Sequence, residues 1–523
     1  MTMQSAFTAP HFKAAQAGQA VLDRGGNACE AMVAAAAMIA VQYPHMNGLG
    51  GDGFWLISKP GQAPVAIDAC GRASKNVDLA TYARQSELPD SGGAAALTMA
   101  GTVSGWQKAL DYLPGSQSLA ELFAPAIEAA SQGIDVTQSL VNASEKTYSR
   151  LSELASFQRH YLPSGRALQV GDILTNSNLA NTLQQLAERG LDDFYRGDLA
   201  ERMVKGLQAQ GSPLTLDDFH AFEAEYCQPL SVEISQGQLY NLPAPTQGVA
   251  SLTILAIYDQ LAQQAKGELD HIHLLVEATK QAFLTRDRYI TDPNAMSVTS
   301  QSLLDPKRIT QGVEAIELDK ALAWPHVAKP GDTIWMGACD TQGVMVSFIQ
   351  SVYWEFGSGV VAGDTGVLWN CRGKSFSLDP NHHNVLAANK KPFHTLNPAY
   401  ADLRDGRRIV YGTMGGEGQP QTQACLFSRY LYQHFSLEEA ISAPRWLLGR
   451  TWGSDTHSLR LEQGLFDRYQ RELSQRGHEL DQVDDHNELM GHAGAIVLSP
   501  QGQASAATDP RSDGATYLGE QNV

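Results

Sequence analysis

The sequence has few cysteines and no paired cysteine motif. Its six cysteines are scattered along 523 residues, and no two of them are separated by two residues. Zinc cages use closely spaced cysteines, and disulfide frameworks occur mainly in small secreted proteins. We therefore expect neither a metal site nor disulfides, and we expect a reduced, cytoplasmic protein.

Positive charge and long apolar runs are also scarce. The chain has 38 Lys and Arg against 56 Asp and Glu, a formal net charge of −18, which argues against nucleic acid or an anionic membrane as a partner. The longest apolar run, residues 31–41, is too short to span a bilayer. The first residues lack the basic and then apolar segments of a secretory signal. A local arginine could still attract a small anion, so the net charge does not exclude an anionic substrate.

The composition is that of a globular protein. With 43% hydrophobic and 18% charged residues, the chain can form two or three ordinary domains or one large layered domain. Residues 12–42 predict two Ala-rich helices broken at Gly25 and Gly26. The glycine cluster at residues 47–53 lacks the preceding strand and the Gly-Lys-Ser/Thr of a phosphate loop, so it predicts a tight turn.

Residues 331–351 predict a β-hairpin that is central to the interpretation. Asp340 and Gly343 open and close a tight turn between two β-branched and aromatic runs. Pairing Asp340 with Val344 places Thr333 directly across from Ser351, close enough for their side chains to hydrogen-bond. If the bond between residues 332 and 333 were cut, the new α-amino group, with an ordinary pKa of about 7.7–8.0, could activate the Thr333 hydroxyl as a nucleophile.

Each of these signals has an ordinary structural explanation. A threonine at the start of a strand is usually only a strand former. Gly415 and Gly416 lie between a predicted strand and a predicted helix, where backbone N–H groups could bind an oxyanion or simply form a turn. Arg72, just past a predicted strand at residues 65–68, is a candidate anion binder or a solvated surface residue.

The order of motifs along nearly the whole chain resembles the γ-glutamyltranspeptidase family. The motifs that carry the resemblance are residues 47–54, 101–105, 243–248, 286–288 with 292–293, 331–333, 357–363, 414–416, 443–445 and 509–511. The resemblance implies an α+β fold, the four-layer αββα sandwich of N-terminal nucleophile hydrolases. It also implies a proenzyme that cuts itself between Asp332 and Thr333 into fragments 1–332 and 333–523, which stay associated as one αββα domain.

The resemblance implies the catalytic residues as well. Thr333 is the nucleophile, Ser351 the supporting hydroxyl (a Thr in most of the family), and Gly415 and Gly416 supply the oxyanion-hole amides. No metal or cofactor is needed.

The chain departs from the family where transpeptidases bind the glutamyl group. The arginine that binds the α-carboxylate is replaced by Cys70, with Arg72 two residues later. The positions that hold the α-ammonium group are Tyr353, Arg372 and Ser375. A site that exchanges an acid for a base is unsuited to an ammonium group, so γ-glutamyl recognition is not expected.

Two further departures lie close by. The paired serines of the family are replaced by His394 and Thr395, and the lid-like loop between residues 376 and 390 is shorter. We take Arg72, Tyr353, Arg372, His394 and Thr395 as candidate substrate-binding residues.

A pocket with arginine and no acid predicts a small anionic amide without an α-ammonium group. Within the family, the cytoplasmic branch that hydrolyses oxamate to oxalate and ammonia in purine-nitrogen breakdown fits best. The first alternative is a γ-glutamyl or glutaryl-type acylase or transpeptidase, and the second is an inactive relative that serves as a binding module. A homodimer of the cleaved pair is possible on this reading.

Overall fold

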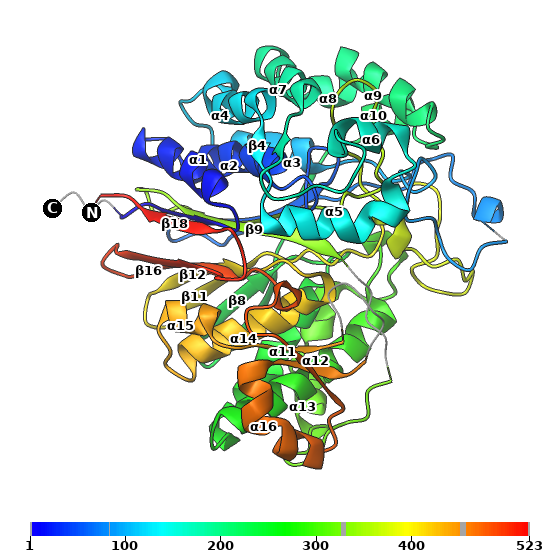
Figure 1. Ribbon diagram of the computed structural model, residues 1–523. Helices are drawn as coiled ribbons and strands as arrows, with labels where there is room; N and C mark the ends of the chain where they lie inside the picture. Colours follow the sequence, from blue (N-terminus) through cyan, green and yellow to red (C-terminus); the bar gives the residue numbers. More distant parts are fainter. Residues whose placement is uncertain (1–2, 83, 326–330, 450–456, 521–523) are drawn as a thin grey trace.

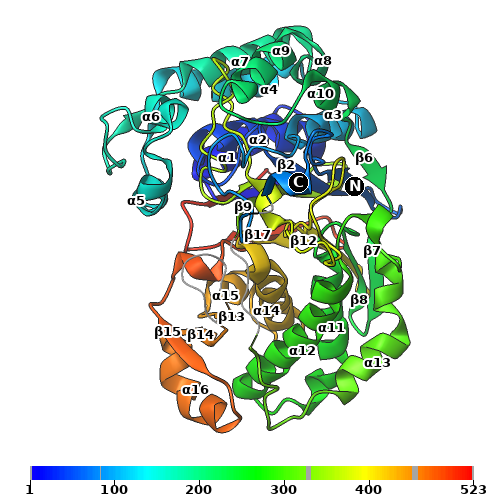
Figure 2. The same ribbon diagram turned by 90° about the vertical axis from the view of Figure 1, so that its right-hand side faces the viewer.

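Two antiparallel sheets lie face to face between two layers of helices (Figure 1). The computed structural model describes residues 3–82, 84–325, 331–449 and 457–520. The four layers follow the order helix, sheet, sheet, helix, which confirms the predicted αββα sandwich. The turned view in Figure 2 shows the same layers from the side.

The first sheet has seven strands, with the predicted hairpin at its centre. In spatial order they are β18 (Ala515–Leu518), β1 (Ala6–Ala9), β9 (Asp332–Cys339), β10 (Met345–Tyr353), β2 (Asp52–Ser58), β3 (Val65–Ala69) and β6 (Glu225–Cys227). The burial of β9 and β10 along their whole length fits this central position.

The second sheet has six strands from both halves of the chain. In spatial order they are β17 (Ala504–Thr508), β16 (Gly494–Leu498), β12 (Arg408–Gly412), β11 (Ala399–Leu403), β8 (Gly237–Asn241) and β7 (Leu230–Ile234). Smaller sheets are formed by β13 (Trp446–Leu448), β14 (Leu459–Glu462) and β15 (Leu480–Val483), and by β4 (Ile134–Asp135) with β5 (Ile173–Leu174).

Helices cover the outer face of each sheet. The layer on the first sheet contains α1 (Phe12–Asp23), α2 (Ala28–Gln42), α3 (Thr102–Tyr112), α4 (Leu119–Gln132), α5 (Gln138–Leu151), α6 (Ala155–Tyr161), α7 (Ser177–Arg189), α8 (Asp193–Arg196), α9 (Asp198–Gln208) and α10 (Leu216–Ala221). The layer on the second contains α11 (Gly248–Leu261), α12 (Glu268–Tyr289), α13 (Pro306–Glu314), α14 (Gln419–Leu431), α15 (Leu437–Ser442) and α16 (Gln463–Gln475). Within the described ranges, no helix is both long and apolar enough to cross a membrane.

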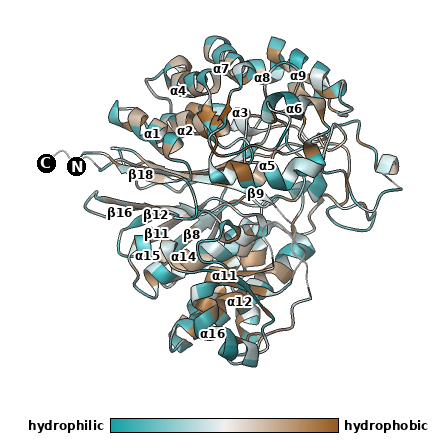
Figure 3. Cartoon of the chain, in the orientation of Figure 1, coloured by the Kyte–Doolittle hydropathy of each residue, from teal (hydrophilic) through white to brown (hydrophobic). Residues whose placement is uncertain are grey.

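The two Ala-rich helices predicted for residues 12–42 are confirmed as α1 and α2. A capping box starts α2: the Asn27 side chain accepts the N–H of Glu30, and the Glu30 carboxylate accepts the N–H of Asn27. This exchange satisfies backbone donors that a helix start otherwise leaves unpaired. The helix is buried along its whole length and is coloured hydrophobic in Figure 3.

Strand β9 has apolar side chains on both faces because it lies between two hydrophobic layers. Ile334, Met336 and Ala338 pack with the helices above the first sheet. Trp335 and Cys339 pack between the two sheets. Since side chains alternate along a strand, Thr333 belongs to the face that meets the second sheet.

The Trp335 ring requires glycine on the opposing sheet. Gly412 and Gly494 are paired across β12 and β16 and leave room for the indole. A Cβ atom on Gly412 would lie 2.2 Å from Cδ1 of Trp335, and one on Gly494 would lie 2.5 Å from its Cζ3. The indole N–H donates to the Ser347 hydroxyl over 2.9 Å. These contacts fix the strand two residues from Thr333.

We expect Gly412→Ala to destabilise the protein by about 1–3 kcal/mol, the usual cost of overpacking a core. Urea unfolding measures this cost. In the double variant with Trp335→Leu the two losses should be clearly less than additive, because the smaller side chain removes the clash. Additive losses would show that Gly412 and Trp335 do not oppose each other.

Candidate active site

The hairpin predicted around Thr333 is present, with one irregularity at its end. Gly343 has φ +76° and donates its N–H to the Asp340 carbonyl over 2.9 Å, as expected for the turn. The predicted register holds from Cys339–Met345 to Ile334–Gln350. A bulge in β10 then shifts the pairing so that Asp332 faces Tyr353. Thr333 and Ser351 therefore do not form the ladder pair that the sequence predicted.

The two hydroxyls nevertheless meet at one atom. Thr333 Oγ and Ser351 Oγ each donate a hydrogen bond of 2.5 Å to the Asp332 carbonyl oxygen. Both side chains are completely buried. Ser351 Oγ is itself oriented, because it accepts the Tyr353 N–H over 2.8 Å. Two donors on one carbonyl draw electron density from its carbon, which makes the carbon more open to attack by a neighbouring hydroxyl.

Gly415 and Gly416 form a left-handed turn after β12, with φ +113° and +51°. Among the described residues, neither amide N–H has a hydrogen-bond acceptor. A Cβ atom on Gly331 would lie 3.2 Å from Cα of Gly416. The turn therefore lies against the segment that leads to Asp332.

A buried polar chain holds this turn in place. The Gln247 amide nitrogen donates to the Gly416 carbonyl over 2.7 Å, and its oxygen accepts from Arg286 over 2.9 Å. Arg286 also pairs with Glu417 at 2.7 Å. Next along the chain, Gln419 donates to Thr333 Oγ over 3.4 Å. In the sequence Gln419 lies three residues after Gly416, and Gln247 lies in the motif of residues 243–248, but neither was predicted to be a site residue.

Arg372 forms a buried cationic group beside the hairpin. Its guanidinium lies 4.0 Å from the centre of the Tyr353 ring, and its Nε lies 3.7 Å from Asp52 Oδ2. Within the described residues none of its three guanidinium nitrogens has a hydrogen-bond partner. Burial lowers the pKa of Arg372, and the charge of Asp52 opposes that change. Buried guanidinium groups ordinarily have hydrogen-bond partners, so this one is suited to an anionic ligand.

Asp52 corrects the expectation of a pocket without an acid. The carboxylate accepts the Gly71 N–H over 2.8 Å and lies 3.0 Å from Nε2 of His394. His394 Nδ1 accepts the Leu396 N–H, which leaves Nε2 as the donor to Asp52. Burial raises the pKa of Asp52 to about 7, although Arg372 and Gly71 oppose the rise. Asp52 was not predicted to be a site residue, although it is the one charged residue in the glycine cluster of residues 47–53.

The remaining candidates lie in different places. The Thr395 hydroxyl is buried without a partner among the described residues, and a Cβ atom on Gly331 would lie 3.5 Å from it. Arg72 is not brought to this group: it pairs with Asp292 at 3.2 Å and lines a separate cavity of about 840 Å³. Its guanidinium is therefore already occupied.

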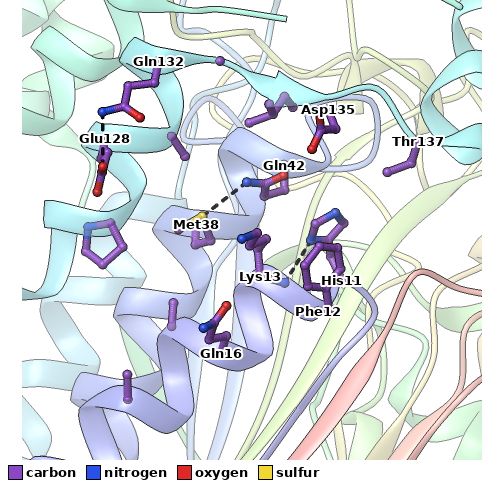
Figure 4. Close-up of a pocket in the computed structure, with 16 residues that line it drawn as sticks. His11, Phe12, Lys13, Gln16, Met38, Gln42, Glu128, Gln132, Asp135 and Thr137 are labelled. Atoms are coloured by element: carbon purple, nitrogen blue, oxygen red, sulfur yellow. Dashed lines mark hydrogen bonds between the residues drawn. The ribbon is translucent and has the colours of Figure 1, made fainter. Parts of the chain in front are cut away.

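Another cavity, of about 560 Å³, opens between α1, α2 and α4 and shares no lining residue with this site. Figure 4 shows Lys13, Gln42 and Asp135 around it. Polar, charged and apolar side chains line it together, and neither Thr333 nor Arg372 is among its lining residues.

Two buried groups in the described part of the chain could in principle bind a metal ion. They are Asp52, Cys70 and His394, and His273, Glu277 and His478. In the first group the nearby Arg372 opposes a second cation. In the second, Lys280 pairs with Glu277 at 2.6 Å, and the two histidines hydrogen-bond to each other over 2.9 Å. We assign no metal to either.

Comparison with known proteins decides the family. The family model described as Gamma-glutamyltranspeptidase matches residues 14–519. The chain belongs to the γ-glutamyltranspeptidase family. The predicted family is thus confirmed, and this γ-glutamyltranspeptidase family member is a hydrolase of the N-terminal nucleophile type.

Two relatives and one solved structure each match nearly the whole of this chain. The oxamate amidohydrolase proenzyme of Klebsiella pneumoniae subsp. pneumoniae is 50% identical over 511 residues, 97% of both chains. The glutathione hydrolase-like YwrD proenzyme of Bacillus subtilis is 41% identical over 512 residues, also 97% of both. The crystal structure of cephalosporin acylase from Bacillus halodurans superposes with a TM-score of 0.90 at 31% identity, covering 99% of this chain and 96% of that one.

We expect Ser351→Ala in this family member to slow any reaction at the Asp332 carbonyl by about 2- to 12-fold. It removes one of two donors, and a neutral hydrogen bond contributes about 0.5–1.5 kcal/mol net. Ser351→Thr, which keeps the hydroxyl, serves as the control and should retain the wild-type rate. Conversion of full-length chain to fragments on a denaturing gel gives the rate. Equal rates for Ser351→Ala and wild type would contradict the assigned contact.

Proposed function

We propose that this protein is a self-processing amidohydrolase that cleaves oxamate to oxalate and ammonia. The observation that carries the proposal is the buried guanidinium of Arg372, which has no hydrogen bond to any described residue and lies beside the hairpin that holds Thr333. The 50% identity to an oxamate amidohydrolase proenzyme supports it.

Maturation begins with Thr333. Its Oγ attacks the Asp332 carbonyl carbon, the acyl group moves from nitrogen to oxygen, and water hydrolyses the resulting ester. The products are fragments 1–332 and 333–523. The contacts of Thr333 Oγ and Ser351 Oγ with the Asp332 carbonyl support this step.

Turnover uses the amine that maturation exposes. The α-amino group of Thr333 accepts the hydroxyl proton as Oγ attacks the amide carbon of the substrate. The N–H groups of Gly415 and Gly416 bind the developing oxyanion, and each such donor typically contributes about 2.7–4 kcal/mol. The carbon–nitrogen bond breaks, ammonia leaves with a proton from the amine, and water releases oxalate from Thr333.

Arg372 selects the substrate through its carboxylate. A planar guanidinium can donate two parallel hydrogen bonds to a carboxylate. The Tyr353 ring covers Arg372, and the Tyr353 backbone pairs with Asp332 next to the scissile bond. This bulky residue therefore joins the cation to the strand of the nucleophile, and its size favours a small substrate. The charge of Asp52 favours the charged form of Arg372, and His394 contacts the Asp52 carboxylate.

A glutaryl-type or γ-glutamyl acylase is the alternative. Arg372 would also suit the carboxylate of a longer substrate, and the likeness to a cephalosporin acylase supports an acylase activity. Asp52 is an acid within the pocket, but its oxygens are engaged by Gly71 and His394, which argues against ammonium binding. A panel of oxamate, glutaryl and γ-glutamyl amides separates these activities. Faster cleavage of γ-glutamyl amides than of oxamate would overturn the substrate assignment.

Purified wild-type protein should run as two fragments, the smaller of which begins at Thr333. Thr333→Ala should remain one chain and be inactive, because maturation and turnover use the same hydroxyl. N-terminal sequencing and a denaturing gel test both expectations. A full-length chain that hydrolyses oxamate, or a cut at another bond, would refute the mechanism. An uncut chain without activity would instead favour the inactive binding module.

Arg372→Met should reduce kcat/KM for oxamate by tens to thousands of fold. Loss of one partner of a desolvated charge pair costs about 2–5 kcal/mol. Arg72→Met is the matched control and should keep near-normal kcat/KM, since Arg72 pairs with Asp292. Self-cleavage should persist in both variants, which verifies folding. A larger loss in Arg72→Met than in Arg372→Met would transfer the binding role to Arg72.

A further inference from the structure

The side chain of Asp332 turns back on the peptide bond that the residue itself contributes. Its Oδ1 accepts the N–H of Thr333 over 2.8 Å. The two hydroxyls that contact this peptide lie on its carbonyl oxygen. Among the described residues, the Asp332 carboxyl is therefore the group placed at the nitrogen, which must gain a proton when the bond breaks.

The surroundings of this carboxyl favour its protonated form. Asp332 is only 3% exposed and lines a small cavity. The charged and titratable groups around that cavity are Glu355 after β10, Lys146 on α5, Glu488 in the turn Glu488–Met490 and His45 after α2. Lys146 and Glu355 pair with each other at 2.5 Å. Burial first, and Glu355 next, raise the pKa of Asp332 well above its usual range, against the opposing effects of the Thr333 N–H and Lys146.

We propose that the Asp332 carboxyl is the proton donor to the Thr333 nitrogen during self-cleavage. This inference rests on the proposed function, because it concerns the maturation step. As the bond from Thr333 Oγ to the Asp332 carbonyl carbon forms, the carbon–nitrogen bond breaks and the nitrogen takes the carboxyl proton. The proton lost by Oγ restores the carboxyl, so the acyl shift consumes no other reagent. Water then hydrolyses the ester and regenerates the Thr333 hydroxyl.

This role ends with maturation. After cleavage, Asp332 is the last residue of fragment 1–332, whereas turnover depends on the free amine of Thr333. The Asp332 side chain should therefore control the rate of cleavage and not the turnover of cleaved protein. A purely structural role would affect both, or would lack a dependence on pH.

Asp332→Asn keeps an acceptor for the Thr333 N–H but has no acidic proton. We expect it to slow self-cleavage by about 100- to 10,000-fold, the usual contribution of a general acid. The wild-type rate should fall at alkaline pH as the carboxyl ionises, and this fall should be absent in Asp332→Asn. Asp332→Glu should recover part of the rate and the pH dependence. Full-length chain from cell-free synthesis, followed on a denaturing gel from mildly acid to alkaline pH, gives the rates.

The molecules of Asp332→Asn or Asp332→Glu that do mature should hydrolyse oxamate with the wild-type kcat per mole of cleaved chain. Wild-type cleavage rates in Asp332→Asn would overturn the inference, as would a slow variant that keeps the wild-type pH profile or an Asp332→Glu variant no faster than Asp332→Asn. If wild type itself is not cut before Thr333, the proposed function fails. If wild type is cut there and Asp332→Asn is unaffected, only the role of Asp332 fails.

Discussion

The site is organised around the hydrogen bonds that Thr333 and Ser351 donate to one buried carbonyl oxygen, that of Asp332. This arrangement depends on a break in regular strand pairing. A regular ladder would place Thr333 and Ser351 directly opposite each other and would not direct both hydroxyls to the same carbonyl oxygen. The bulge in β10 supplies this departure from regular pairing. Strand interruptions of this kind occur often beside active sites, where they redirect a side chain.

The layered fold serves that contact by fixing the strand around it. Apolar side chains hold β9 on both faces, and Trp335 fills the space left by glycine in the second sheet. The same sheet delivers the Gly415–Gly416 turn, which Gln247 and Arg286 anchor from below. Directly after this turn, Gln419 donates to the hydroxyl of Thr333, 86 positions before it in the chain.

The buried Arg372 beside the hairpin reconciles an acidic protein with the anionic substrate proposed for it. A net charge of −18 sets the long-range potential, but Arg372 is completely buried and supplies a local positive charge beside the hairpin. Asp52 partly offsets that charge through a contact of 3.7 Å, and no described residue occupies the hydrogen-bond donors of Arg372. The guanidinium therefore stays charged and remains able to bind a carboxylate.

The sequence predicted the features that depend on local pattern. The hairpin, its turn at Gly343, most of its register and the glycine turn after β12 follow from strand periodicity and glycine placement. The bulge at the end of β10 does not, because there Tyr353 has φ +85°, a backbone conformation that non-glycine residues seldom adopt and that strand periodicity does not indicate. The same limit explains Arg72 and Arg372. Arg72 lies in a loop and Arg372 begins a short 3-10 helix, and only the folded chain pairs Arg72 with Asp292, 220 positions away, while leaving Arg372 without a hydrogen bond to any described residue.

The central claim is that the Thr333 hydroxyl is the nucleophile, and trapping the acyl-enzyme tests it most directly. Protein mixed with oxamate and quenched in acid within one turnover can be digested and analysed by mass spectrometry. The account predicts an oxalyl ester on the peptide that begins with Thr333 and on no other peptide. An oxalyl group on a different residue, or rapid oxamate hydrolysis with no acylated Thr333 at any quench time, would contradict it.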